Sequence, residues 1–223
     1  NLQNTLQTNR WVVNGDIQIP FQALGYSWTP ESLQKALQDE NPWVKGIAAK
    51  ALGRTNAKEC FASLVPLLSH AEPWVRLVAI ETLGVFKNPM TLATILKMFT
   101  DSDYKVRGMA ALISGQFESD KAIKPLQDLL KKEQNPEVIE KIAAALSWIP
   151  HTDSIDLLCH HLYHQKTSTL VSIITTLGIL EAEEKKNEIL PFLKHHDANV
   201  VNATLKTLAK FKSDSSYADL KNL

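Results

Sequence analysis

The sequence predicts an all-α protein, a right-handed α-solenoid built from about six short helix pairs that stack side by side. Two observations predict this fold. Apolar residues recur at helical spacing in units that are about 31 residues apart along most of the chain. A turn containing proline or aspartate also precedes the second helix of most units. Because one helix pair cannot bury its apolar face alone, such units gain a continuous core only by stacking.

One residue in each unit fixes the register of the repeat, and we call it the anchor. The anchors are spaced by 31, 31, 32, 31 and 31 residues, and they are Val44, Val75, Val106, Val138, Thr169 and Val200. Apolar or small residues follow four and eight positions later, from Ala48 and Leu52 in the first unit to Thr204 and Leu208 in the last. This spacing is typical of a helix face that packs against a core. It predicts the second helix of each pair.

Both ends of this second helix carry signals of their own. Its start is marked by the dipeptides Asn41-Pro42, Glu72-Pro73, Ser102-Asp103 and Asn135-Pro136. Proline costs no hydrogen bond there, because the first N–H groups of a helix have no partner inside it. Nine positions after the anchor, four of the six units have glycine, at Gly53, Gly84, Gly115 and Gly178. We expect this glycine to be the left-handed residue that ends the helix.

A second apolar stretch with helical spacing precedes each turn and predicts the first helix of the pair. Examples are Phe61, Leu64, Leu67 and Leu68, then Leu92, Ile95, Leu96 and Phe99, then Leu126, Leu129 and Leu130. Each unit therefore reads as a helix, a tight turn and a second helix.

The repeat resembles a known family. Its pattern begins with an aspartate such as Asp39 or Asp101 and continues with Pro or Tyr, Val-Lys/Arg, Ala and Leu-Gly. This pattern resembles the short HEAT repeats that also occur in the phycobilisome-lyase group. The match covers about residues 30–211. The resemblance implies a stacked-helix scaffold and, as an alternative, a bilin-lyase subunit or a chaperone of that type. The last three units depart from the pattern, because Ile139, Leu170 and Val201 stand where the earlier units have Lys or Arg.

The chain divides into three predicted regions. Residues 30–211 hold the six repeats. Residues 1–29 do not fit the repeat, and Asn14-Gly15 between two short apolar stretches predicts a β-hairpin. This region is either a cap over the apolar end of the stack or a small partner-binding element. Residues 212–223 are either a half-repeat cap or the beginning of a further repeat.

Composition narrows the possible partners. The 24 basic and 24 acidic residues give a net charge of zero, which argues against a nucleic-acid partner. A DNA glycosylase built on HEAT-like repeats is disfavoured for the same reason. No apolar stretch approaches the roughly 18 residues that span a membrane. Cys60 and Cys159 lie three repeats apart, so we expect free thiols, a reducing compartment and a cytoplasmic location.

The histidines are the first candidates for chemistry. His164 and His195 both stand five residues before an anchor and should be neighbours in the stack, which makes them weak candidates for a metal pair. The competing interpretation is that this position holds a polar residue that bonds the turn, because Asp39, Asp101 and Glu133 occupy it in other units. We predict no metal ion and no cofactor.

The strongest functional candidates lie on the second helices. No catalytic triad, nucleophile elbow or phosphate-binding loop is present, so the sequence favours a non-enzymatic scaffold that binds a protein or peptide. The family resemblance implies that the binding face is the concave one, lined by the second helices. The predicted contact residues are Trp43, Trp74, Arg76, Leu77, Arg107, Leu112 and Trp148. Trp and Arg are the commonest anchors of binding surfaces. The alternatives are that the two tryptophans pack on each other and that the two arginines bond the turns.

Overall fold

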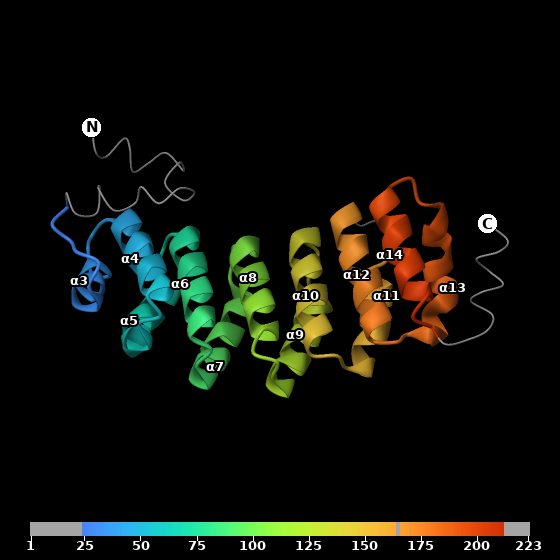
Figure 1. Ribbon diagram of the computed structural model, residues 1–223, viewed down its shortest axis with the longest axis horizontal. Helices are drawn as coiled ribbons and strands as arrows, with labels where there is room; N and C mark the ends of the chain where they lie inside the picture. The colour runs from blue at the N-terminus through green and yellow to red at the C-terminus, as the bar shows by residue number, and fades with distance from the viewer. Residues whose placement is uncertain (1–23, 164–165, 212–223) are drawn as a thin grey trace. The chain divides into compact units, whose positions relative to one another are not determined.

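The protein is almost entirely helical. The computed structural model describes residues 24–163 and 166–211, and in these ranges it contains twelve α-helices and no β-strand (Figure 1). This confirms the predicted all-α class. The helices are α3 (Pro30–Ala36), α4 (Pro42–Arg54), α5 (Phe61–Leu64), α6 (Pro73–Phe86), α7 (Pro89–Lys97), α8 (Tyr104–Gly115), α9 (Ile123–Leu130), α10 (Pro136–Trp148), α11 (Ile155–His160), α12 (Thr167–Ile179), α13 (Lys186–Ile189) and α14 (Ala198–Leu208).

The helices alternate between two kinds. Each even-numbered helix from α4 to α14 contains one anchor, and we call these six the B helices. The odd-numbered helix before each of them is the A helix of the same pair. The six predicted helix pairs are therefore all present in the described part of the chain.

The A helices are shorter than the sequence pattern suggests, because most of them combine an α-helical part with 3₁₀ turns. Helix α5 continues as the 3₁₀ segment Val65–Ser69, and α13 continues as Leu190–Lys194. A proline, Pro66 or Pro191, stands at the start of each segment. Proline lacks the N–H that would continue the α-helical ladder and clashes with the preceding turn, so the helix tightens there.

The B helices begin where the turn signals predict. The side chains of Asn41, Asp103, Asn135 and Asp197 each accept a hydrogen bond from a backbone N–H in the first turn of their helix. Thr29 caps the first A helix in the same way, at 3.4 Å from the nitrogen of Ser32. Such caps satisfy N–H groups that have no partner within the helix.

The predicted core ladder is buried in every pair. All six anchors are at most 1 % exposed, and the same holds for the residues four and eight positions later. The polar members of the ladder satisfy their hydroxyls locally. Thr204 donates to the carbonyl of Val200 at 2.8 Å, and Ser114 donates to the carbonyl of Ala111 at 2.8 Å. The repeat register predicted from the sequence is therefore the register of the core.

The role predicted for the repeated glycine is wrong. Gly53, Gly115 and Gly178 have no positive φ and lie inside their helices or at the last helical residue. The left-handed residues come three positions later and are not glycines: Asn56, Lys87, Glu118 and Glu181, with φ of 46 to 51°. A Cβ atom at Gly115 would stand 2.5 Å from the Cα of Ala145, and one at Gly178 would stand 2.7 Å from Oγ1 of Thr207. Glycine is therefore needed for close packing between neighbouring B helices.

The described helices form two compact units. The first ends at Thr91 and contains α3 to α6, with α4 packed against α6. The second begins at Leu92, and within it α8, α10, α12 and α14 pack against one another in chain order. The handedness of the superhelix and the single repeat domain over residues 30–211 stay predictions. The predicted hairpin around Asn14-Gly15 and the predicted C-terminal element over residues 212–223 lie outside the described residues. No helix in the described ranges has the length and apolar character to span a membrane.

Candidate protein-binding surface

Where the structure describes it, the polar residue five positions before an anchor bonds the turn of its own repeat. In the described units, the side chain at this position accepts a hydrogen bond from the backbone N–H two residues later. The acceptors are Asp39 (2.8 Å), His70 (3.0 Å), Asp101 (2.9 Å), Glu133 (3.0 Å) and His195 (3.1 Å). His70 and His195 use Nδ1 for this bond. The turn-bonding interpretation therefore accounts for these two histidines.

The candidate metal pair receives no support from this geometry. His164 lies outside the described residues, and the Nδ1 of His195 is already an acceptor. The ring of His195 stacks on that of His196, with centroids 4.2 Å apart. Among the residues that the structure describes, no group of three His, Cys, Asp or Glu side chains is arranged to hold a metal ion.

Arg76 and Arg107 also bond the turns. The Nη1 atom of Arg76 donates to the carbonyls of His70 and Ala71, at 2.8 and 2.9 Å, and the residue is buried. Arg107 donates from Nη1 to the carbonyls of Asp101 and Ser102, at 3.0 and 3.2 Å. In both cases the arginine stands one position after the anchor, so it closes the turn that begins its own helix.

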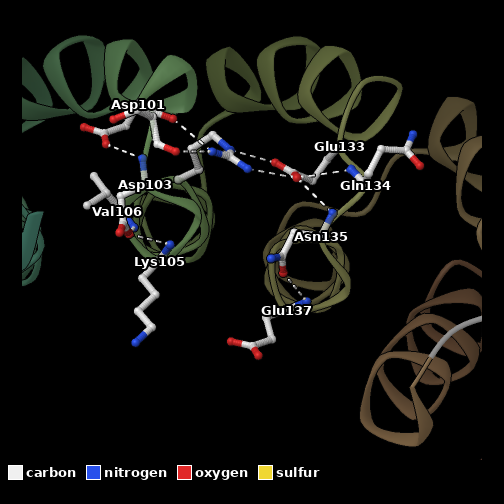
Figure 2. A network of polar contacts seen from close by, with 10 residues as sticks. Asp101, Asp103, Lys105, Val106, Glu133, Gln134, Asn135 and Glu137 are labelled. Carbon is white, nitrogen blue, oxygen red and sulfur yellow. Dashed lines mark hydrogen bonds and ion pairs between the residues drawn. The ribbon is translucent and has the colours of Figure 1, made fainter.

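Arg107 additionally connects two repeats. Its Nε and Nη2 donate to the two carboxylate oxygens of Glu133, at 2.8 and 3.0 Å (Figure 2). Burial by itself would raise the pKa of the Glu133 carboxyl, but hydrogen bonds from Arg107 and from the backbone N–H groups of Asn135 and Gln134 lower it below its usual value. The bidentate pair thus ties the turn before α8 to the turn before α10.

The two tryptophans of the first unit pack on each other. The rings of Trp43 and Trp74 lie 4.5 Å apart at an angle of 27°. Both residues are half-buried. Gly46 lies beneath the Trp74 ring, where a Cβ atom would collide with it. The two rings therefore pack on each other, which is the alternative that the sequence left open.

The remaining candidates differ in exposure. Leu77 and Leu112 are half-buried, whereas Trp148 is 42 % exposed. Ile179 stands at the equivalent position one repeat later and is 38 % exposed. The prediction did not include Ile179 among the contact residues. The signal for it is its repeat position, since Trp148 and Ile179 both stand ten residues after an anchor.

Both cysteines are free, as predicted, and the structure shows that both are buried. Burial, together with the nearby carboxylate of Glu188, raises the pKa of the Cys159 thiol to about 12. Burial and the charge of Glu59 raise the pKa of Cys60. Because the thiolate is the reactive form, neither residue is suited to nucleophilic chemistry.

The chain is similar to known proteins in sequence pattern and in fold. A family model described as HEAT repeats matches residues 30–103 and 92–178. The Escherichia coli protein YibA has a similar structure, with a TM-score of 0.72 and 17% identity over 99% of this chain and 88% of that one. The complex of CpcE and CpcF of phycocyanin lyase from Nostoc sp. has a TM-score of 0.62 and 21% identity, over 87% of this chain and 81% of that one. The structure of an engineered protein has a TM-score of 0.62 and 18% identity, over 84% of this chain and 97% of that one. A search of curated protein sequences found no match.

Proposed function

The chain belongs to the HEAT-repeat family, and on that premise we propose that it is a non-enzymatic scaffold that binds a protein or peptide along the B helices. A stack of helix pairs offers an extended row of helix faces, and repeat proteins of this kind use such rows for binding. The observation that carries the proposal is the exposure of Trp148 and Ile179 at one repeat position.

Exposed large apolar side chains are informative when they recur at one place. Scattered apolar residues occur on every protein surface, but a group of them on one face marks an interaction site. Trp148 and Ile179 form such a group at the C-terminal ends of α10 and α12. Tryptophan is also among the residues most often found to dominate binding energies.

The candidate residues contribute unequally to this proposal. Trp148 is the principal contact, and Leu77 and Leu112 supply half-buried apolar surface on other B helices. Arg76 and Arg107 support the surface indirectly, because their guanidinium groups hold the turns that begin α6 and α8. Trp43 and Trp74 present only the parts of their rings left uncovered by mutual stacking.

Co-purification with quantitative mass spectrometry tests the proposal. The wild-type chain is compared with Trp148→Ser and with a control, Tyr163→Ser, which removes a 58 % exposed aromatic residue that follows α11. We expect at least one protein to be retained by the wild type and the control and lost with Trp148→Ser. If Ala substitutions at Leu77, Leu112 and Trp148 all leave every co-purifying protein unchanged, the proposed function is wrong.

A role in bilin attachment is the alternative that the sequence resemblance implies. The likeness to the phycocyanin-lyase complex, at 21% identity, concerns the fold. No described residue of this chain favours a tetrapyrrole partner, so we do not extend the proposal to it. An absorbance titration of the chain with free bilin decides the matter, because a lyase or a chaperone of that type must shift the bilin spectrum.

A further inference from the structure

The exposed residues Trp148 and Ile179 are the fourth and fifth of six equivalent positions, each ten residues after an anchor. Both residues end their helices, and α10 packs against α12 within the second unit. Packed helices have axes about 8–10 Å apart, so the two residues stand at corresponding ends of neighbouring helices. We call them the Trp148–Ile179 patch.

The repeat does not require apolar residues at this position. Ten residues after the other anchors stand Arg54, Val85, Gln116 and Lys210. Arg54 and Lys210 are exposed, so the fold accepts a charged side chain there. The core ladder is complete without these positions, since the anchors and their partners are buried on the opposite side of each helix. The stack of helix pairs therefore does not require the apolar side chains of Trp148 and Ile179.

The repeat next to the patch carries Lys206 on helix α14 and Lys210 two residues after that helix ends. Helix α14 packs against α12, and Lys206 and Lys210 follow its anchor by six and ten residues. They correspond in register to Thr175 and Ile179 of α12. Both lysines are exposed, and neither forms an ion pair with any residue between 24 and 163 or between 166 and 211. Positive charge thus borders the apolar patch on one side.

Two acidic residues of α10 already have partners. Glu137 pairs with Lys166 at 3.4 Å, and Glu140 accepts a 2.7 Å hydrogen bond from the hydroxyl of Ser168. These contacts lie near the N-terminal ends of α10 and α12, at the other end of the helices from Trp148 and Ile179. Among the residues ten positions after an anchor, the one that follows Ile179 in the row is therefore positively charged, Lys210.

We infer that the Trp148–Ile179 patch binds a protein segment that carries a large apolar side chain next to acidic residues. The apolar side chain packs on Trp148 and Ile179, and the acidic side chains face Lys206 and Lys210. Complementary charge of this kind orients a partner and speeds its association, while the buried apolar anchor supplies most of the affinity. This inference rests on the proposed scaffold function and adds to it the location of the contact and the chemistry of the partner.

Selection from a phage-displayed library of random linear peptides on the immobilised full chain tests the inference. Enriched peptides are then synthesised with a fluorescent label, and their binding is measured by anisotropy at low and high salt. The variants are Trp148→Ser combined with Ile179→Ser, and Lys206→Glu combined with Lys210→Glu. The controls are Tyr163→Ser and Lys132→Glu, which change an exposed aromatic residue and an exposed lysine on other parts of the second unit. Circular dichroism verifies that every variant is folded.

We expect the enriched peptides to combine aromatic or large aliphatic residues with Asp and Glu. The apolar double variant should weaken their binding about tenfold or more, as loss of a central anchor does. The charge-reversal variant should weaken binding at low salt and much less at high salt, because salt screens exposed charges. Both controls should bind as the wild type does.

Three results would overturn the inference. Enriched peptides without an acidic excess, or equal binding by the charge-reversal variant, would refute the stated partner chemistry and leave the scaffold function intact. Peptides that bind the apolar double variant normally would place the contact elsewhere on the chain. Absence of any enrichment would refute peptide docking at this patch, and the co-purification experiment would then decide the scaffold function separately.

Discussion

The hydroxyl of Thr207 on α14 donates a 2.9 Å hydrogen bond to the backbone carbonyl of Ile174 on α12. The same bond recurs elsewhere in the stack. Thr176 donates to the carbonyl of Ala143 at 3.0 Å, and in the first unit Thr82 donates to the carbonyl of Ala49 at 3.2 Å. All three threonines stand seven residues after an anchor and are buried. They join neighbouring B helices by a polar contact that the apolar core does not provide.

Replacing Thr207 by valine should lower the free energy of unfolding by about 1 kcal/mol. The change keeps the branched shape and removes one buried hydrogen bond, whose net contribution is of that size. The matched control is Thr175→Val on the exposed side of α12, which should change stability little. Urea denaturation followed by circular dichroism measures both. Equal stability of the two variants would show that the inter-helix bond contributes nothing.

Gly115→Ala should destabilise the protein more than Gly53→Ala. The new Cβ at residue 115 meets backbone atoms of Ala145, which cannot move alone, and we expect a loss of about 1–3 kcal/mol. At residue 53 the nearest atom is a Thr82 methyl at 3.1 Å, and the gain in helix propensity of roughly 1 kcal/mol offsets the crowding. Denaturation curves of the two variants give the comparison. The reverse order would refute the close-packing role of these glycines.

The pair of Arg107 and Glu133 should make stability depend on pH in the acidic range. The pKa of Glu133 is lower in the folded chain than its unfolded value of about 4.3. The contribution of Glu133 to the free energy of unfolding is therefore complete at pH values above its unfolded pKa. It is lost as the pH falls through the folded pKa of Glu133. Between pH 6 and pH 3 the wild type should lose more stability than Glu133→Gln. Thermal unfolding across this range measures the difference, and parallel pH profiles would contradict the prediction.

Removal of one partner of this pair should cost more than removal of both. Arg107→Met leaves the Glu133 carboxylate 6 % exposed and without its counter-charge, and we expect a loss of about 2 kcal/mol or more. Arg107→Met combined with Glu133→Leu should recover part of that loss. A double-mutant cycle from denaturation data provides the measurement. Additive losses would mean that the two side chains do not interact.

Cys159 and Cys60 should be unreactive in the folded protein. With the pKa of Cys159 raised to about 12, less than about one thousandth of this thiol is ionised at pH 8, since each pKa unit is a factor of ten. An aromatic disulfide reagent should react with neither thiol at pH 8 and with both after unfolding in guanidinium. Rapid reaction of the native protein would contradict the burial of the two side chains.

Local sequence determined the register of the helical repeat in this protein. The anchor spacing and the apolar residues four and eight positions later identify the buried face of each B helix, because a helix repeats every 3.6 residues and one face must be apolar. The caps at Asn41, Asp103 and Asn135 follow equally directly, since a short polar side chain at a helix start has one dominant use. These features depend on neighbours within one or two turns of the chain.

Tertiary structure decided what the remaining repeated residues do. The glycines nine positions after the anchor are not left-handed residues that end their helices. Gly115 and Gly178 instead admit a neighbouring helix that lies about 30 residues away in sequence. Arg76 and Arg107 bond turn carbonyls, and only Trp148 and Ile179 remain exposed among the large side chains near the ends of α10 and α12. A repeat pattern gives the position of a residue on its own helix, but its exposure and its partners depend on the distance to the next helix. That distance is set by packing between the helices.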